Sequence, residues 1–291
     1  DDTNVAACAK HYIGYGASEG GRDYHKTEIS DYSLRNYYLR AFKAAVDSGV
    51  LTVMSSFNEI SGQPVSSSKY LLTDVLRGEL GFDGFVISDW EAVKQLIRQG
   101  VAETDEEAAI MALSAGLDMD MTDNFYVDNL EKSVRDGKLS EEIIDTAVRR
   151  VLKVKDKLGL FDNPYAEHID LPKQEIRDAA RKCAAESLVL LKNDNNVLPL
   201  KKEETICVMG SMAFDTINIV GSWTADTDYS ENVSVYEGLK AKSDNIIQYN
   251  CHTPENHTMG NLKQCDKILI VLGEAKAVTG EANSMAKTEL T

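Results

Sequence analysis

Gly81-Phe82-Asp83-Gly84-Phe85-Val86-Ile87-Ser88-Asp89-Trp90 is the stretch of sequence that decides the fold. Within it, the compact apolar run Phe85–Ser88 is typical of a short buried strand. Apolar residues with helical spacing occupy Lys69–Leu80 before this stretch and Asp105–Ala115 after it. A buried strand between two helices is the unit from which α/β sheets are built.

The same alternation extends in both directions along the chain. Further strands are expected over Val5–His11, Val50–Phe57 and Gly116–Met121, and further helices over Ser33–Ser48 and Ser140–Leu158. Four βα units in a row imply a parallel sheet with right-handed crossovers. Four units fit half of a (β/α)8 barrel or an open doubly wound sheet, and periodicity does not separate the two.

The chain changes character within residues 161–200. Phe161–Pro172 is rich in turn residues, and a helix is expected after it over Lys173–Leu191. A second alternation then follows, with strands at Ile206–Gly210 and Lys267–Leu272 and a helix at Val235–Lys242. We therefore predict a first α/β domain over residues 1–160, a linker with a connecting helix over 161–200, and a second α/β domain over 201–291.

Composition narrows the classes of function. The formal net charge of −16 over 291 residues repels phosphate backbones, so we expect no nucleic-acid partner. No apolar stretch is long enough to span a bilayer, so no membrane span is expected. Asp1-Asp2-Thr3-Asn4 shows no signal peptide, as is also true of a mature secreted chain. The five cysteines form no CxxC pair, and Cys8 and Cys207 are expected to be buried in strands.

Candidate chemistry lies where the expected strands end, because α/β folds bind ligands at the carboxyl ends of their strands. The residues at these positions include Lys10, His11, Met54, Phe57, Asp89, Trp90, Asp118, Asp120, Glu274 and Glu281. Sugar hydrolysis needs two carboxyl groups, one ionised and one protonated. A structural hydrogen-bonding role is the better interpretation of Asp118 and Asp120. The residues alone therefore indicate an α/β enzyme with an acidic site.

Long motifs follow one another through nearly the whole chain. They are Ala9–Gly16 with Gly20–Tyr24, Val53–Asn58, Leu71–Arg77 with Gly81–Trp90, Ala115–Met119, and Ser187–Asn193 with Leu198–Leu200. In this order they resemble the motifs of glycoside hydrolase family 3, in particular its β-glucosidases. The resemblance implies a TIM-like (β/α)8 barrel followed by an α/β sandwich domain, with the active site between them. It implies no metal or organic cofactor.

The resemblance also implies roles for residues of the first domain. Asp89 would be the nucleophile that forms a covalent glycosyl-enzyme, and Lys10 would help to keep it ionised. The residues that would bind the sugar of the −1 subsite are Lys10, His11, Met54, Phe57 and Trp90. In the second domain, Gly280-Glu281-Ala282-Asn283-Ser284 resembles the family's acid/base loop, so Glu281 would be the acid/base. Met285 stands where an arginine is usual, and Glu274 is the alternative.

The resemblance places this sequence inside a longer protein. We expect an internal fragment that lacks the first half of the barrel and the end of the sandwich, and that has little or no glycosidase activity alone. The expected function is a retaining exo-acting β-glucosidase with a β-glucoside or oligosaccharide as substrate. β-Xylosidase, β-N-acetylglucosaminidase and a non-catalytic carbohydrate-binding relative are the alternatives. The loop Gly14-Tyr15-Gly16 lacks the second histidine of the hexosaminidases, which counts against them.

Two further expectations concern the setting of the protein. A periplasmic or secreted location is expected, with the cytoplasm left open. A homo-oligomer or a complementing chain is kept open as a partner, because half a barrel would have an unpaired parallel edge. An open-sheet cofactor enzyme is disfavoured, because the chain has neither a GxGxxG turn nor a P-loop.

Overall fold

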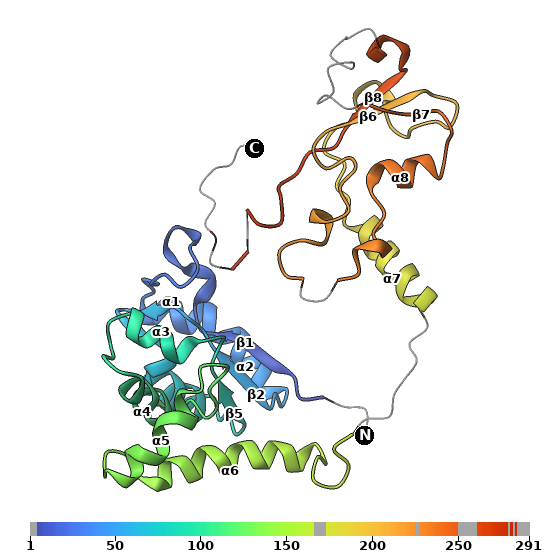
Figure 1. Cartoon of the computed structure of the whole chain (residues 1–291). Coiled ribbons are helices and arrows are strands. Elements are labelled where there is room, and N and C mark those ends of the chain that lie inside the picture. The colour runs from blue at the N-terminus through green and yellow to red at the C-terminus, as the bar shows by residue number, and fades with distance from the viewer. Residues whose placement is uncertain are drawn as a thin grey trace. The chain divides into compact units, whose positions relative to one another are not determined.

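The structure is a computed structural model that describes residues 5–165, 173–224, 227–249, 261–278, 280–281 and 283. The chain forms two compact units, Asp1–Glu167 and His168–Thr291, and each is described by itself (Figure 1). Both units combine helices with a parallel sheet, so the chain is an α/β protein, as predicted.

Unit 1 contains a parallel sheet with the strand order β1-β2-β5. The strands are β1 (Cys8–Tyr12), β2 (Thr52–Ser55) and β5 (Phe85–Ile87), which confirms three of the predicted strands in shorter form. The central residues Val53 and Val86 are fully buried. Since the strands are parallel, His11, the residues after Ser55 and Asp89 all come to the same edge of the sheet.

The strand predicted over Gly116–Met121 is wrong except for one parallel bridge between Ile87 and Met119. Backbone hydrogen bonds join this segment to Val86, Ser88 and Glu91, and two side chains supplement them. The Oδ2 atom of Asp118 accepts from the N–H of Val86, and the hydroxyl of Ser88 accepts from the N–H of Met121.

Helices cover the sheet of unit 1, and the long α6 runs along one side of the unit (Figure 1). The helical elements are α1 (Asp31–Ser33), the π-helical η3 (Leu34–Tyr38), α2 (Leu39–Asp47), the π-helical η5 (Tyr70–Glu79), α3 (Ala92–Arg98), α4 (Asp105–Ala115), α5 (Phe125–Arg135) and α6 (Glu141–Lys157). All four predicted helices of this region are confirmed. The two that the sequence did not reveal, α3 and α5, begin after Glu91 and Asn124, whose own side chains do not cap them.

Local sequence explains where the confirmed helices begin. The hydroxyl of Thr104 accepts from the N–H of Glu107 at the start of α4, and that of Ser140 accepts from Glu142 at the start of α6. A short antiparallel hairpin, β3 (Glu59–Ile60) with β4 (Gln63–Pro64), follows β2.

A buried ion network supports the strand that leads to Asp89. The carboxylate of Asp118 has a side-chain exposure of 1% and accepts from Arg77 (Oδ2 to Nη2, 2.5 Å), Arg150 (Oδ1 to Nη1, 2.7 Å) and the N–H of Val86 (2.8 Å). Arg77 also donates to the carbonyl of Gly84 at 2.9 Å. The structural role predicted for Asp118 is therefore confirmed, and it joins β5 to η5 and α6.

Unit 2 contains a second parallel sheet with the order β7-β6-β8. Its elements are α7 (Lys173–Glu186), β6 (Ile206–Met209), α8 (Val235–Lys240), β7 (Ile246–Gln248) and β8 (Lys267–Ile270). The helix predicted as far as Leu191 ends at Glu186, because the apolar run Leu188–Leu191 has no helical spacing and is exposed. Ser234 and Glu237 form a capping box at the start of α8.

The two cysteines predicted to be buried behave differently. Cys207 is buried in the central strand β6, as predicted. Cys8 is exposed, and that prediction is wrong, because β1 is the first strand in the sheet order and no described strand covers its other edge. Among the described helices, none combines the length and the apolar character that crossing a bilayer requires.

Candidate active site

Asp89 lies directly after β5, in a sharp turn between this strand and α3. Glu91 adopts a left-handed conformation with φ of 52°, and the N–H of Ala92 donates to the carbonyl of Asp89 at 3.1 Å. The N–H of Glu91 donates to the carbonyl of Met121, which ties this turn to the next loop. Asp89 is 8% exposed, so its carboxyl group is largely removed from water.

The two oxygens of Asp89 differ in their surroundings. Oδ1 accepts a hydrogen bond of 2.7 Å from the N–H of Trp90. Oδ2 lies 3.2 Å from Nε2 of His11, close enough for an ion pair when the imidazole is protonated. Within the described part of the chain, no donor forms a hydrogen bond to Oδ2, although this oxygen is buried. One oxygen therefore holds the orientation of the carboxylate, and the other faces the imidazole of His11.

The structure brings His11 and Asp89 together but shows no such contact for Lys10. Lys10 is exposed, and no ion pair between it and Asp89 is present among the described residues. The peptide bonds Lys10–His11 and Tyr12–Ile13 are both cis. Trp90 is 60% exposed, so a broad face of its ring is open to a ligand.

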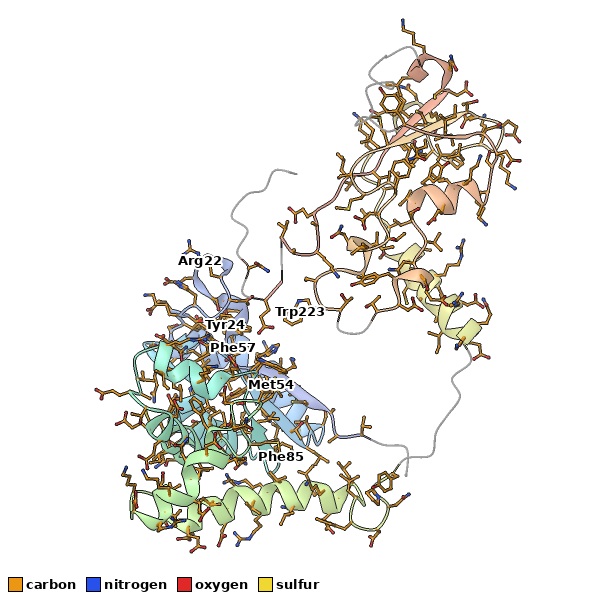
Figure 2. The ribbon with its side chains drawn as sticks, in the orientation of Figure 1. Arg22, Tyr24, Met54, Phe57, Phe85 and Trp223 are labelled. Carbon is orange, nitrogen blue, oxygen red and sulfur yellow. The ribbon has the colours of Figure 1, made fainter. Side chains whose placement is uncertain are left out.

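Met54 lies near the end of β2, and Phe57 follows the strand at the same edge of the sheet. Met54 is half-buried and Phe57 is buried. The ring of Phe57 packs against Tyr24, with 4.6 Å between ring centroids, and against Tyr15, at 5.9 Å. Figure 2 labels Tyr24, Phe57 and Met54, and the first two lie beside each other there. Neither tyrosine was predicted as a site residue from the sequence. Their contacts connect the loop after β1 to Phe57, which lies more than 30 positions later in the chain.

Two more carboxyl groups lie in the loop that follows Met119. Burial raises the pKa of Asp123 to about 6, and the N–H of Lys94, which donates to Asp123 Oδ2 at 2.9 Å, opposes this shift. Burial also raises the pKa of Asp120, against the backbone N–H groups of Tyr126 and Phe125. Because both carboxylates accept from the first turns of α3 and α5, their role is to cap helices. For Asp120 this agrees with the structural role predicted.

The acid/base candidates Glu281 and Glu274 belong to unit 2. Glu281 is half-buried in a turn, after Gly280 with φ of 110°. A Cβ at Gly280 would lie 2.7 Å from the Cβ of Ser222, so this turn requires glycine. Glu274 is half-buried beyond β8. Ala282, Ser284 and Met285 of the predicted acid/base loop lie outside the described residues.

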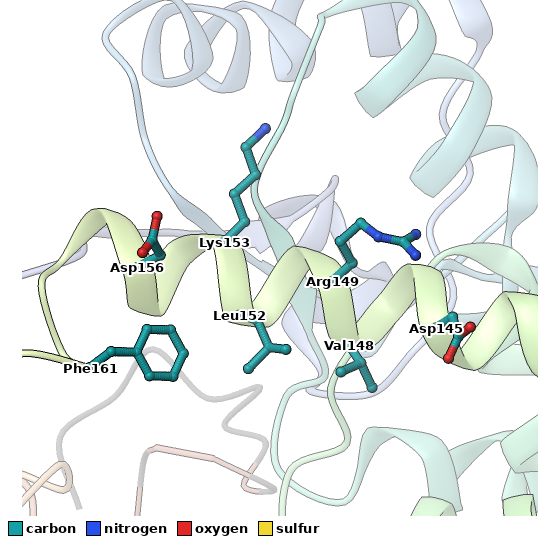
Figure 3. A pocket seen from close by; sticks show the side chains of 7 residues that line it. All are labelled: Asp145, Val148, Arg149, Leu152, Lys153, Asp156 and Phe161. Atoms are coloured by element: carbon teal, nitrogen blue, oxygen red, sulfur yellow. The ribbon is translucent and has the colours of Figure 1, made fainter.

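A groove of about 610 Å³ along α6 is a separate feature of unit 1 (Figure 3). It is lined by Val148, Leu152 and Phe161 with charged side chains on both sides. Its two acids, Asp145 and Asp156, are eleven residues apart on one helix, or about 16 Å at 1.5 Å per residue. A retaining glycosidase needs carboxyl groups only about 5 Å apart, so this groove does not suit that chemistry.

Among the described residues, no three or more His, Cys, Asp and Glu side chains gather closely enough to hold a metal ion.

Comparison with known proteins gives consistent matches along the whole chain. Residues 1–154 match the profile of the glycosyl hydrolase family 3 N terminal domain, and residues 188–291 match that of the family 3 C-terminal domain. The chain is 35% identical to a periplasmic beta-glucosidase of Salmonella typhimurium, covering 98% of this chain and 42% of that protein. It is 33% identical to a beta-xylosidase of Formosa agariphila, covering 100% of this chain and 44% of that protein.

Solved structures agree with the sequence matches. The crystal structure of a beta-glucosidase from Listeria innocua in complex with glucose matches with a TM-score of 0.90 and 36% identity, covering 99% of this chain and 42% of that one. A b-glucosidase from Erythrobacter marinus matches with a TM-score of 0.82 and 31% identity. The chain thus spans less than half the length of the relatives it matches.

Proposed function

The chain belongs to glycosyl hydrolase family 3, and we propose that it carries the nucleophile of a retaining, exo-acting β-glycosidase, in the first place a β-glucosidase. We propose further that unit 1 is the second half of a (β/α)8 barrel and unit 2 part of an α/β sandwich. The parallel order β1-β2-β5 with helical crossovers supports the first assignment. The substrate class rests on relatives and solved structures named as β-glucosidases.

The observation that carries this proposal is the environment of Asp89. A nucleophilic carboxylate must be oriented and must keep one oxygen free to attack the anomeric carbon. Asp89 meets both needs, since Oδ1 is held by the N–H of Trp90 and Oδ2 is buried without a hydrogen bond from the described residues. Attack by Oδ2 forms a glycosyl ester while a general acid protonates the departing oxygen. Water then hydrolyses the ester with the same acid acting as base.

Other residues of the chain take supporting roles in this proposal. His11, with Nε2 at 3.2 Å from Asp89, and the exposed Lys10 donate hydrogen bonds to sugar hydroxyls. The exposed ring of Trp90 offers a face for the apolar side of the pyranose. Met54 and Phe57 line the same subsite at the end of β2. Glu281 is the acid/base, with Glu274 as the alternative.

A second candidate activity, β-xylosidase, is favoured by the relative of that name. For location we propose the periplasm or the exterior of the cell, on the strength of the relative named as periplasmic. We also propose that the partner of this chain is a second copy of it or a chain that complements it.

Stereochemistry and nucleophile replacement together test the function. The protein that carries this sequence is purified whole from its host, so that any further segments are retained. We expect it to hydrolyse a nitrophenyl β-glucoside with β-glucose as the first product by NMR, and a nitrophenyl β-xyloside more slowly. Asp89→Ala should abolish turnover, and azide should restore it with α-glucosyl azide as product.

The matched control is Asp74→Ala, because Asp74 is exposed on η5, and it should keep full activity. α-Glucose as the first product, or an Asp89→Ala protein as active as wild type, would contradict the proposal. Faster hydrolysis of the xyloside would favour the second candidate. The 291-residue chain alone is assayed beside it, and we expect little or no turnover.

A further inference from the structure

Tyr15 lies between two residues of the candidate active site. Its ring meets the imidazole of His11 edge-on, with 5.5 Å between centroids and 64° between planes. On the other side it packs against Phe57. The sequence motifs predicted neither contact. In the sequence, the loop Gly14-Tyr15-Gly16 was used only to note that it lacks the second histidine of the hexosaminidases.

Hydrogen bonds hold Tyr15 in this place. Its hydroxyl donates to Oδ1 of Asp23 at 2.7 Å, and the hydroxyl of Ser18 donates to its carbonyl at 2.9 Å. Burial, together with the bond to Asp23, raises the pKa of Tyr15 well above its usual range, so the phenol stays a donor. Since the hydroxyl is committed to Asp23, what Tyr15 presents to the site is its ring.

The segment that carries Asp23 is itself fixed to the strand end. The N–H of Thr27 donates to the carbonyl of Glu59 at 2.7 Å, and Nδ2 of Asn58 donates to the hydroxyl of Thr27 at 2.9 Å. Glu19 and Lys26 close the loop with a backbone hydrogen bond of 3.1 Å. Asp23 is therefore a defined acceptor within a closed loop.

The orientation of a histidine ring is weakly determined by its own torsion. The terminal torsion of His is broad and roughly two-fold, so packing has to select the angle. Nε2 of His11 reaches Asp89 Oδ2 only over a limited range of this angle, and Tyr15 restricts it from one side. Supporting residues of this kind set the precision of a site.

We propose that Tyr15, held by Asp23, is a positioning residue that orients His11 toward Asp89, an inference that rests on the proposed function. Tyr15 acts through His11, whose hydrogen bond to the sugar would strengthen in the transition state, so loss of Tyr15 should slow the reaction step more than it weakens affinity. Misplacement of a reacting group by about 1 Å can cost about 100-fold in rate.

The test measures covalent labelling of Asp89 by a 2-fluoro-β-glucoside in the whole protein, as a maximal rate and a dissociation constant. Tyr15→Leu removes both the ring and the hydroxyl, and we expect its maximal labelling rate to fall about 10- to 100-fold with the dissociation constant little changed. Tyr15→Phe keeps the ring but loses the hydrogen bond and should fall less. Asp23→Asn keeps an oxygen acceptor and should label at close to the wild-type rate.

Tyr37→Leu is the matched control, because Tyr37 is 70% exposed on η3. It should label like wild type. A Tyr15→Leu protein that labels at the wild-type rate overturns the inference, as does a loss of affinity with the maximal rate unchanged. If Tyr15→Leu fails to fold, Tyr15→Phe decides: a rate equal to wild type overturns the role of the Asp23 hydrogen bond. An unlabelled wild type contradicts the proposed function itself, which separates the two failures.

Discussion

Removal of the Asp118 carboxylate is expected to destabilise unit 1 strongly, because three buried partners lose their acceptor. Asp118→Ala leaves the guanidinium of Arg77 without its partner at 2.5 Å and the N–H of Val86 without its acceptor at 2.8 Å. Burial raises the pKa of Asp118 and lowers that of Arg77, because both charges have left water, and their mutual attraction opposes these shifts.

The magnitude follows from the cost of breaking a buried ion pair. Removing one partner of such a pair typically costs about 3–5 kcal/mol, because the other charge stays buried. An orphaned buried N–H costs about 1–3 kcal/mol, but the two terms overlap in one network and do not simply add. We therefore expect unit 1 to lose about 3–5 kcal/mol, a large share of the about 5–15 kcal/mol typical of a domain.

Hydrogen-exchange mass spectrometry measures this loss where it occurs. Peptides that cover β5 report the free energy of opening of unit 1 separately from unit 2. Arg150→Met should cost less than Asp118→Ala, because Arg77 still pairs with the carboxylate. Arg149→Met is the matched control, since its exposed side chain should contribute almost nothing. An Asp118→Ala protein within about 1 kcal/mol of wild type would refute this reasoning.

Three further predictions concern single residues. Because the folded pKa of Asp123 is raised to about 6, the fold loses stability as pH rises from about 4, where the unfolded carboxyl ionises, to about 6, where the folded one does. Asp123→Asn should therefore have a higher melting temperature than wild type at pH 8. A difference in melting temperature that fails to narrow toward pH 4 would count against this prediction. Gly84→Ala should strongly destabilise unit 1 in urea unfolding, since a Cβ there would lie 2.0 Å from the carbonyl of Leu51; an unchanged midpoint would refute it. The sequon Asn232-Val233-Ser234 should stay unmodified in a glycosylating host, because Nδ2 of Asn232 donates to the carbonyl of Thr216 and the buried Ser234 hydroxyl donates to Glu237. A glycan detected by intact-mass spectrometry would contradict this prediction.

Much of the fold could be predicted because apolar periodicity is a local property. Helices with side-chain caps, such as α4 and α6, are visible in the sequence at Thr104 and Ser140. α3 and α5 begin at left-handed residues without such a cap, so no local pattern announces them. The strand predicted after Gly116 reduces to one bridge between Ile87 and Met119, where the side chains of Asp118 and Ser88 bond the backbone beside the backbone hydrogen bonds.

The candidate site could be predicted only as a set of residues, without its contacts. The position of Asp89 after a buried strand followed from the sequence, but the difference between its two oxygens depends on His11, 78 positions earlier in the chain. Tyr15 and Asp23 were missed because nothing in their own segment shows the aromatic contacts with His11 and Phe57.

Peptide mapping of a trapped glycosyl-enzyme tests most directly whether Asp89 is the nucleophile. The whole protein is inactivated with a 2-fluoro-β-glucoside, digested, and the modified residue is identified by tandem mass spectrometry. We predict one fluoroglucosyl group on Asp89 and no labelling of Asp89→Asn. A label on any other carboxylate, or labelling that persists in Asp89→Asn, would contradict the account.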